Sequence, residues 1–218
     1  MIKTFAGPMH SAKTASLLVV YNKIWNKEHI KCFKPTKDTR DPGVLKSKDF
    51  EETVPAICID NLSEILEHID DKTSTIFIDE IQWLEGNVGI LNYLSIVKDI
   101  DIYTAGLNMT SEQQPFGIMP YVLAISDEVQ IIKASCYDCG RDAPLTYYKG
   151  KKDVDTIVGD EGYLPLCPKC LKRRESENDL VLRLIKKNNQ DWLFFFFEIK
   201  ILIIKPTNVT KLIIIGIR

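Results

Sequence analysis

The first residues of the chain restrict its fold more than any other segment. A short apolar run, Ile2–Ala6, passes into a glycine-containing loop and then into a helical pattern. Further apolar runs follow at intervals that leave room for connecting helices, and they lie at His29–Phe33, Val54–Ile59, Thr75–Ile78 and Asp101–Ala105. Strands that alternate with helices in this way form a parallel sheet with helices on both faces. We therefore predict an α/β fold.

The segments between these runs carry apolar residues at helical spacing. Asn61 and Glu64 stand in the positions of a capping box at the start of the second such segment. The residues expected to share a buried helical face are Leu17, Leu18, Tyr21, Ile24 and Trp25 in the first segment, Leu62, Ile65, Leu66 and Ile69 in the second, and Ile90, Leu91, Leu94 and Val97 in the third.

The loop after the first strand matches a phosphate-binding pattern at Gly7, Lys13 and Thr14, with Ala12 where a second glycine normally stands. At the start of a helix, backbone N–H groups point at phosphate oxygens, a lysine neutralises them and a hydroxyl holds Mg²⁺. A Gly-Pro turn followed by an exposed lysine is the alternative. The candidate phosphate-binding residues are Gly7, Pro8, Met9, His10, Ser11, Ala12, Lys13 and Thr14.

Two carboxylates, Asp79 and Glu80, follow the strand Thr75–Ile78. In a parallel sheet the carboxyl ends of the strands form the edge at which ligands bind. We expect Asp79 to help hold Mg²⁺ together with Thr14, and Glu80 to accept a proton from an attacking hydroxyl. Acidic residues at strand ends are often only solvent-exposed residues at the start of a loop. The functional interpretation of this pair therefore depends on the nearby phosphate loop.

Four cysteines form two close pairs, Cys136 with Cys139 and Cys167 with Cys170. Two such knuckles supply the four thiolates of a closed, structural Zn²⁺ site. We interpret the single cysteines Cys32 and Cys58 as small core residues. The N-terminus has no apolar signal region, so paired cysteines indicate a reducing cytoplasm and metal binding rather than disulfides.

The formal net charge of −2 gives no basic field for nucleic acid or for an anionic membrane. We divide the chain into a nucleotide-binding α/β domain (1–133), a small zinc-binding domain (134–172), a charged C-terminal helix (173–190) and an atypical apolar tail (191–218). Charged residues interrupt the tail before it reaches the length of about 20 apolar residues that a membrane helix requires.

These residues together resemble the type II, or cellular-type, thymidine kinase family. The similarity extends in order over most of positions 1–170. The matching blocks are the phosphate loop, Asp38-Thr39-Arg40, Ile78-Asp79-Glu80-Ile81-Gln82-Trp83, Ala105-Gly106-Leu107, Pro115-Phe116-Gly117, and the segment from Gly159 through Tyr163-Leu164-Pro165-Leu166-Cys167. The last block is similar to the family's lasso, a loop that closes over the nucleoside and is anchored by the zinc.

The resemblance implies transfer of the ATP γ-phosphate to the 5′-hydroxyl of thymidine, with Glu80 as general base and Arg40 adding positive charge at the phosphates. It implies ATP, Mg²⁺ and structural Zn²⁺, a homotetramer, and feedback inhibition by thymidine triphosphate. Trp83 is expected either in the nucleoside pocket or in the core. The nucleoside-binding residues implied are Gln82, Trp83, Val158, Gly159 and Tyr163.

Several residues depart from the family pattern and mark a divergent member. The departures are Ala12, Lys48, Ser111, Tyr148 and Pro168. They leave open the alternative that the protein is a catalytically weakened homologue, which binds nucleotide or nucleoside without turnover. A zinc-knuckle protein that binds nucleic acid is a third hypothesis, which the near-neutral charge disfavours.

Overall fold

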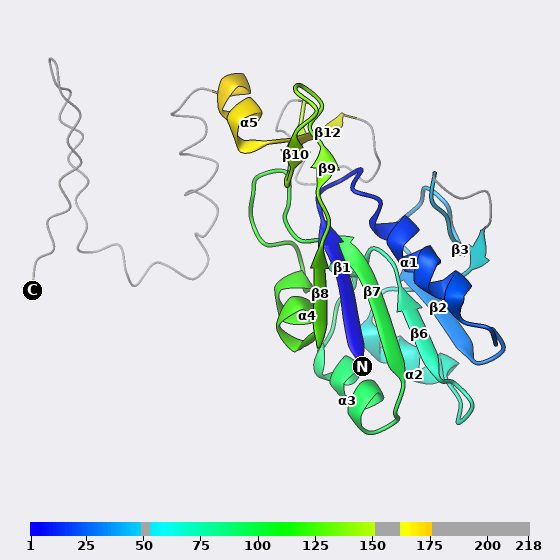
Figure 1. Cartoon of the computed structure of the whole chain (residues 1–218). Helices are drawn as coiled ribbons and strands as arrows, with labels where there is room; N and C mark the ends of the chain where they lie inside the picture. Colours follow the sequence, from blue (N-terminus) through cyan, green and yellow to red (C-terminus); the bar gives the residue numbers. More distant parts are fainter. Residues whose placement is uncertain (49–52, 151–161, 176–218) are drawn as a thin grey trace, which may run out of the picture.

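The computed structural model describes residues 1–48, 53–150 and 162–175. Six parallel strands form the central sheet in the order β5-β2-β6-β7-β1-β8 (Figure 1). This confirms the predicted parallel α/β fold. The strands are β1 (Ile2–Gly7), β2 (Ile30–Pro35), β5 (Ile57–Ile59), β6 (Thr75–Ile78), β7 (Asp101–Leu107) and β8 (Glu128–Ile131).

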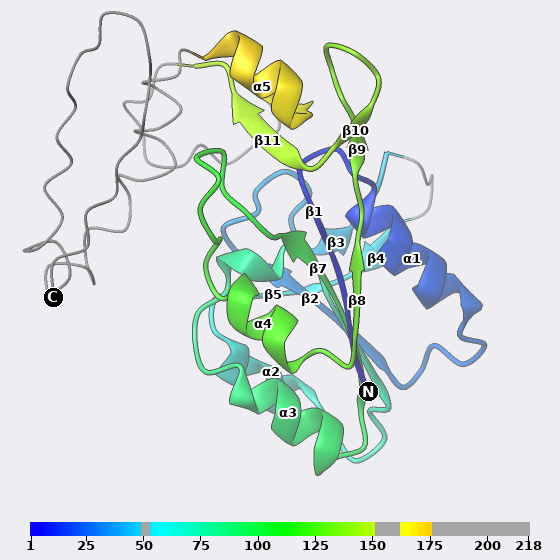
Figure 2. The ribbon, with the colours of Figure 1, turned by 60° about the vertical axis from the view of Figure 1, so that its left-hand side comes forward.

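Helices cover both faces of the sheet. Helix α1 lies on one face, whereas α2, α3 and α4 lie on the other (Figure 2). The bounds are α1 (Lys13–Lys23), α2 (Ile65–His68), α3 (Gly89–Ile96) and α4 (Met119–Ile125), with short 3₁₀ turns η1 (Leu62–Glu64) and η2 (Ile81–Trp83) before α2 and after β6.

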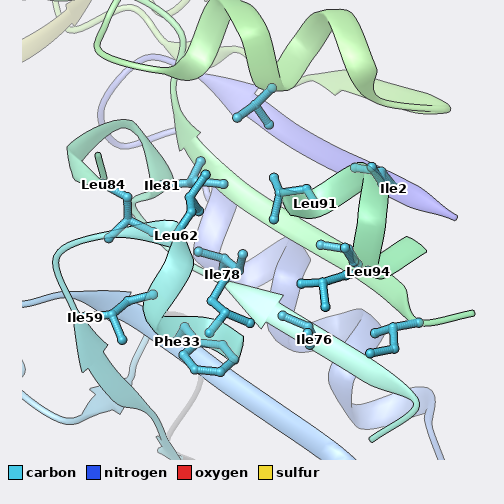
Figure 3. Close-up of a cluster of buried hydrophobic side chains, with 14 of the residues drawn as sticks. Ile2, Phe33, Ile59, Leu62, Ile76, Ile78, Ile81, Leu84, Leu91 and Leu94 are labelled. Atoms are coloured by element: carbon cyan, nitrogen blue, oxygen red, sulfur yellow. The ribbon is translucent and has the colours of Figure 1, made fainter. Parts of the chain in front are cut away.

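The core is split by the sheet into two layers. Strand side chains alternate between faces, so Ile76 and Ile78 pack toward Leu91 of α3, while Phe77 packs on the face that α1 covers (Figure 3). All four residues of β6 are buried. Burial on both faces explains why the central strands read as continuous apolar runs.

The predicted strand Val54–Ile59 is divided at Ala56. Its first part, β4 (Val54–Pro55), pairs antiparallel with β3 (Val44–Leu45), and only β5 joins the main sheet. The Ala56 N–H donates to the Gly43 carbonyl at 2.8 Å. Pro55 has no N–H to give to a ladder, which suits it to this short outer ribbon rather than to the sheet.

The helical segments follow their predicted positions but are shorter. Helix α1 ends at Lys23 because the Ile24 backbone is extended, so Trp25 is fully exposed rather than part of the buried face. The predicted capping box is confirmed: Asn61 Oδ1 accepts from the Ser63 N–H at 3.0 Å, and Glu64 Oε1 accepts from the Asn61 N–H at 2.7 Å.

Besides the short strand β3, the sequence did not predict helix α4 or the edge strand β8. All four residues of β8 are exposed, and their composition, Glu-Val-Gln-Ile, lacks the continuous apolar run of the inner strands. An edge strand with one neighbour needs less burial, so its sequence signal is weaker.

The cysteine-rich region lies beyond the carboxyl edge of the main sheet (Figure 1). It contains two small antiparallel ribbons and a helix that begins at Pro168, before the predicted start near residue 173. Residues 176–190 of the predicted C-terminal helix and the apolar tail 191–218 lie outside the described residues. The elements are β9 (Ala134–Ser135), β10 (Asp142–Ala143), β11 (Leu145–Tyr148), β12 (Tyr163–Leu166) and α5 (Pro168–Arg174).

Pro168 departs from the family pattern but suits its place. It occupies the first position of α5, where a helix needs no backbone N–H donor. Within the described ranges, no helix combines the length and apolar character that a membrane span would need.

Candidate active site and metal centre

The predicted phosphate loop joins β1 to the start of α1. Gly7 allows this loop to pass close to the chain that follows β8, because a Cβ at Gly7 would lie 2.1 Å from the Ile132 carbonyl oxygen. Ala12 occupies the left-handed region, with φ 58° and ψ 31°. Glycine adopts this conformation freely, whereas an L-residue is strained in it. Ala12 therefore keeps the backbone of the missing glycine at a cost in strain.

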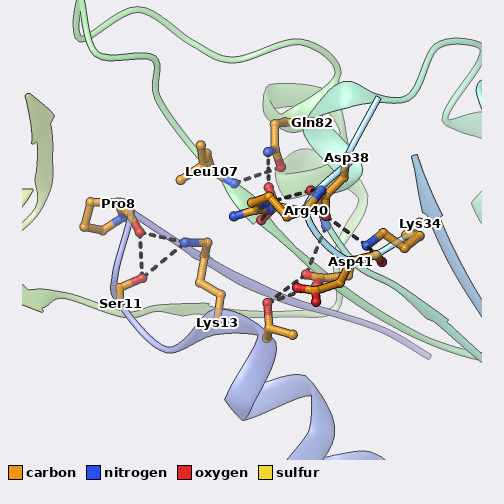
Figure 4. Close-up of polar contacts among 12 residues, drawn as sticks. Pro8, Ser11, Lys13, Lys34, Asp38, Arg40, Asp41, Gln82 and Leu107 are labelled. Atoms are coloured by element: carbon orange, nitrogen blue, oxygen red, sulfur yellow. Dashed lines mark hydrogen bonds and ion pairs between the residues drawn. The ribbon is translucent and has the colours of Figure 1, made fainter. Parts of the chain in front are cut away.

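Lys13 lies inside the loop and is 8% exposed. Its Nζ donates to the Pro8 carbonyl at 2.6 Å and to Ser11 Oγ at 3.4 Å (Figure 4). The ammonium group is thus held within the concave side of the loop, at the N-terminus of an 11-residue helix. Both the helix dipole and this cation favour an anion there.

The two residues predicted to hold Mg²⁺ are brought together. Thr14 Oγ1 donates to Asp79 Oδ2 at 2.9 Å, across the gap between α1 and the end of β6. Burial, together with the charge of the neighbouring Glu80 carboxylate, raises the pKa of Asp79 to about 7. A divalent cation beside Asp79 would offset both effects, so this hydroxyl and carboxylate fit a Mg²⁺ ion.

Glu80 is fixed at both carboxylate oxygens. Arg40 Nη2 lies 2.6 Å from Oε1, and Gln82 Nε2 donates to Oε2 at 2.6 Å. The Glu80 backbone is also left-handed, with φ 51°. A strained backbone that persists because its surroundings hold it is typical of functional sites. The sequence predicted Glu80 and Arg40 as separate motifs, and the fold joins them.

Gln82 orients Glu80 through the hydrogen bond from its Nε2. Its side chain is 2% exposed, and its Oε1 accepts from the Leu107 N–H at 2.9 Å (Figure 4). Gly106 makes room for it, since a Cβ there would lie 2.4 Å from Gln82 Oε1. The resemblance implied a nucleoside contact for Gln82, and that role stays a prediction. In the structure both ends of its amide are already engaged.

A cavity of about 220 Å³ opens between the phosphate loop, the end of β6 and the loop after β2. Lys46 and Asp41 line it although no sequence motif indicated them, and their side chains form an ion pair of 3.1 Å. Asp41 lies in the loop between β2 and β3 and Lys46 directly follows β3, so only the folded chain brings the two side chains to the cavity. The lining residues are Thr14, Asp38, Arg40, Asp41, Lys46 and Glu80.

The predicted nucleoside-binding aromatics lie in pairs. Half-buried Trp83 packs edge-on against Phe116, with ring centroids 4.9 Å apart. Tyr163 packs against Tyr148, one of the departures, at 4.8 Å. Val158 and Gly159 lie outside the described residues.

The phosphate loop is tied to the cysteine-rich region by Thr146 of β11. Its Oγ1 accepts from the Met9 N–H at 3.0 Å, and its carbonyl accepts from Gln113 Nε2 at 3.1 Å. Thr146 is 4% exposed. One buried residue therefore connects β11, the phosphate loop and the loop after β7, which also carries Ser111. The Ser111 hydroxyl donates to Glu112 Oε1 at 2.9 Å.

The four predicted zinc ligands form one cluster. Their sulfur atoms all lie within 4.8 Å of one another, and the Cys139 and Cys167 sulfurs are 3.7 Å apart. Four thiolates at the usual zinc–sulfur distance of about 2.3 Å would have their sulfurs roughly 3.8 Å apart. The donor set and its spacing fit a tetrahedral Zn²⁺ ion. Cys136 and Cys139 come from the β9–β10 turn, and Cys167 and Cys170 flank the start of α5.

Neighbouring hydrogen-bond donors lower the pKa of Cys136 and of Cys139, which favours their thiolate forms, whereas burial raises the pKa of Cys170 to about 12. Arg141 Nε donates to Cys139 Sγ at 3.4 Å, and this hydrogen bond lowers the pKa of Cys139 to about 6. The Cys167 N–H donates to Cys136 Sγ at 3.3 Å. Donors to ligand atoms orient and stabilise such centres.

Comparison with known proteins agrees with this geometry. The thymidine kinase family model matches residues 1–171. A thymidine kinase of Pseudothermotoga lettingae is 31% identical over 79% of this chain and 95% of its own length. Thymidine kinases of Bacteroides fragilis and Porphyromonas gingivalis are 31% and 32% identical, over 81% and 80% of this chain and 89% and 86% of their own lengths. The chain belongs to the thymidine kinase family.

Proposed function

We propose that the protein transfers the γ-phosphate of ATP to the 5′-hydroxyl of thymidine. One observation carries the proposal. A carboxylate suited to act as a base, Glu80, lines the same cavity as Thr14 of the phosphate loop and Arg40. Phosphoryl transfer requires a positioned nucleophile and positive charge around the transferring group, and this cavity offers groups for both.

Glu80 is the proposed general base. Arg40 and Gln82 fix the direction in which its carboxylate points, so a hydroxyl that meets it need not wait for a rotamer change. Such orientation contributes to rate because the reacting groups are held in place in advance. The proton of the 5′-hydroxyl passes to Glu80 as the oxygen attacks the γ-phosphorus and the bond to the ADP leaving group breaks.

The phosphate loop and Arg40 are the proposed binding groups for ATP. Phosphate oxygens would replace the Pro8 carbonyl and Ser11 hydroxyl as partners of the Lys13 ammonium. Thr14 and Asp79 would hold Mg²⁺, which supplies neutralisation of charge on the phosphates. Arg40 lines the cavity beside the proposed base, so its guanidinium can stabilise charge that develops on the transferring group.

The nucleoside is proposed to bind on the side of the cavity that faces the cysteine-rich region. Trp83 and Tyr163 offer aromatic surface to a flat base. Zn²⁺ in the four-cysteine cluster would hold β12 and the segment that precedes it in place, as a structural metal. The homotetramer, the feedback inhibition by thymidine triphosphate and the cytoplasmic location are part of this proposal and rest on the family resemblance.

The test is a transfer assay on the full chain in its zinc-loaded form. The protein is incubated with ATP, Mg²⁺ and thymidine, and products are separated and identified. We expect ADP and thymidine 5′-monophosphate in equal amounts. Deoxycytidine, deoxyguanosine and uridine, each supplied alone, serve as matched acceptors and are expected to react more slowly. Faster transfer to one of them would contradict the thymidine assignment.

A catalytically weakened homologue is the second candidate, and the strained Ala12 favours it. The same backbone angles that match the loop are unfavourable for alanine, so the loop conformation that binds phosphate is populated less. Saturable binding of ATP or thymidine by calorimetry, without any nucleotide product, would support this candidate over the first.

A further inference from the structure

A buried lysine outside the predicted motifs is linked to the proposed base through two other charged side chains. Lys34 lies near the end of β2, and its side chain is 3% exposed. Its Nζ donates to the Asp41 carbonyl at 2.6 Å and to the Val44 carbonyl at 3.2 Å, and it lies 3.1 Å from Asp38 Oδ2. A buried ammonium is costly unless it is paired and hydrogen-bonded, and Lys34 meets both conditions.

Lys34 is the first member of a continuous chain of charges that ends at Glu80. Asp38 contacts Lys34 through Oδ2 and Arg40 through Oδ1, which accepts from Arg40 Nε at 2.7 Å (Figure 4). The Arg40 guanidinium then reaches Glu80 with Nη2. The order along the chain is therefore lysine, aspartate, arginine, glutamate, with alternating sign.

The charge of Lys34 affects how Asp38 acts on Arg40. Burial raises the pKa of Asp38, but the hydrogen bonds and charges of Arg40 and Lys34 outweigh burial and lower it below its usual range. With Lys34 present, Asp38 is an anion shared between the Lys34 ammonium and Arg40. Without Lys34, Asp38 would be a full buried anion facing Arg40 alone, and it would draw the guanidinium away from Glu80.

The two carbonyl contacts add a geometric effect. Asp41 and Val44 lie on the loop that carries Arg40, and Lys34 joins both to the end of β2. Strand β2 is packed between β5 and β6, so it is a rigid support. Removing the ammonium would leave two carbonyls with one partner fewer, and the loop would relax.

We propose that Lys34 is a positioning residue for phosphoryl transfer, which sets the place of Arg40 through Asp38 and through the loop after β2. It does not touch substrate, because its side chain is buried behind Asp38. The inference rests on the proposed function, in which Arg40 and Glu80 meet the reacting groups.

A kinetic double-mutant cycle on the full, zinc-loaded chain tests this role. Lys34→Met keeps the length and apolar stem but removes the charge. We expect kcat for thymidine phosphorylation to fall by about 10- to 100-fold, with KM for thymidine changed less than kcat, since small misplacements of reacting groups have effects of this order. In an Arg40→Met background the same substitution should change kcat by less than about two-fold, because coupled residues are non-additive.

Lys37→Met is the matched control. Lys37 lies in the same loop, is half-exposed and pairs with Glu85 at 3.6 Å, away from Asp38. Its substitution should leave kcat and KM unchanged. If Lys34→Met does not fold, Lys34→Gln replaces it in the cycle, because an amide can still donate to the two carbonyls while lacking the charge. Equal losses of kcat in the presence and absence of Arg40 would overturn the proposal.

A crystal structure of the Lys34 variant gives a readout that does not depend on turnover. We expect the Arg40 guanidinium to leave Glu80, lengthening the 2.6 Å contact beyond hydrogen-bonding range. An unchanged contact would overturn the proposal even in an active enzyme. Absence of thymidine phosphorylation in the unsubstituted protein, together with a displaced Arg40 in the variant, would contradict the proposed function and leave the positioning of Arg40 by Lys34 standing.

Discussion

The carboxyl edge of the sheet and the four-cysteine centre are built in different ways. At the sheet edge, Glu80 and Asp79 follow a fully buried strand, and their partners come from helix α1, the turn η2 and the loop after β2, all supported by the large core. At the cysteine centre, the ribbons β9–β10 and β11–β12 have two to four residues per strand and a separate, small apolar cluster.

The two regions therefore differ in what stabilises them. A large core supports the sheet edge without help from ligands, because apolar burial fixes the strands that carry the polar groups. Short ribbons around a small cluster bury too little surface for that, so we propose that a bound metal supplies the missing stability. We therefore expect changes to the metal to act locally and changes to the core to act globally.

Removal of zinc is the largest expected effect. Cys167→Ser deletes a proposed zinc ligand, and in small zinc domains such a centre contributes on the order of 10 kcal/mol to folding. We expect loss of bound zinc by metal analysis, and fast amide hydrogen exchange in β9 to β12 while β1 and β6 stay protected. Cys58→Ser should keep the zinc, because this thiol lies outside the cluster; it is exposed, so the core position predicted for Cys58 was wrong, whereas Cys32 is buried as predicted. Equal loss of protection in β6 would show that the two regions do not differ as described.

A cavity in the core should lower the stability of the whole fold and leave the bound zinc in place. Leu91→Ala removes a fully buried side chain of α3 and should lower the free energy of unfolding by about 2–5 kcal/mol, measured by urea denaturation. Ile96→Ala on the same helix, 78% exposed, should change it by less than about 0.5 kcal/mol. Zinc content should be unchanged in both variants. Loss of zinc from folded Leu91→Ala protein would break the comparison.

Gly106→Ala tests the sheet edge itself. The added Cβ would displace the Gln82 amide and leave the Leu107 N–H without its acceptor, at a cost of about 1–3 kcal/mol. Because Gln82 also orients Glu80, we expect kcat to fall more than stability alone would explain. Gly140→Ala is a matched glycine substitution in the cysteine-rich region, where a Cβ would meet nothing within 4 Å but φ is +70°, so it strains the backbone without touching Gln82. A kcat no lower than that of Gly140→Ala would argue against the role of Gln82.

The smallest expected effect is at the phosphate loop. Ala12→Gly relieves a left-handed alanine and should raise the free energy of unfolding by about 1 kcal/mol. Ala15→Gly, inside α1, should lower it by a similar amount, because glycine weakens a regular helix. Thermal denaturation of the two variants under one set of conditions compares them. A destabilised Ala12→Gly would contradict the strain described for this loop.

The sequence was most informative where chemistry requires a fixed spacing. The cysteine pairs predicted the four-cysteine cluster, and the phosphate-loop pattern predicted the positions of Lys13 and Thr14. A closed thiolate site and a phosphate loop each restrict both the residue types and their separation. The run Thr75–Ile78 predicted β6 for the same kind of reason, since a strand buried on both faces is continuously apolar.

Other contacts could not be predicted, because they depend on side chains that meet only in three dimensions. Nothing in the sequence pairs Arg40 with Glu80, or Met9 with Thr146, and the intervening chain is long in both cases. Trp25 was assigned to a helical face, but helical spacing does not show where a helix ends. Similarly, the residues of strand β8 are all exposed, so the sequence of this strand lacks the apolar run by which the inner strands were predicted.

The role proposed for Glu80, held by Arg40 and Gln82, is that of the general base in thymidine phosphorylation. Its most direct test is kcat of Glu80→Gln measured beside Glu85→Gln, which alters a 75%-exposed carboxylate a few residues away. We predict a loss of about 10²- to 10⁴-fold for Glu80→Gln, with thymidine and ATP still bound, and no change for Glu85→Gln. A Glu80→Gln enzyme within about two-fold of the unsubstituted protein would contradict the claim.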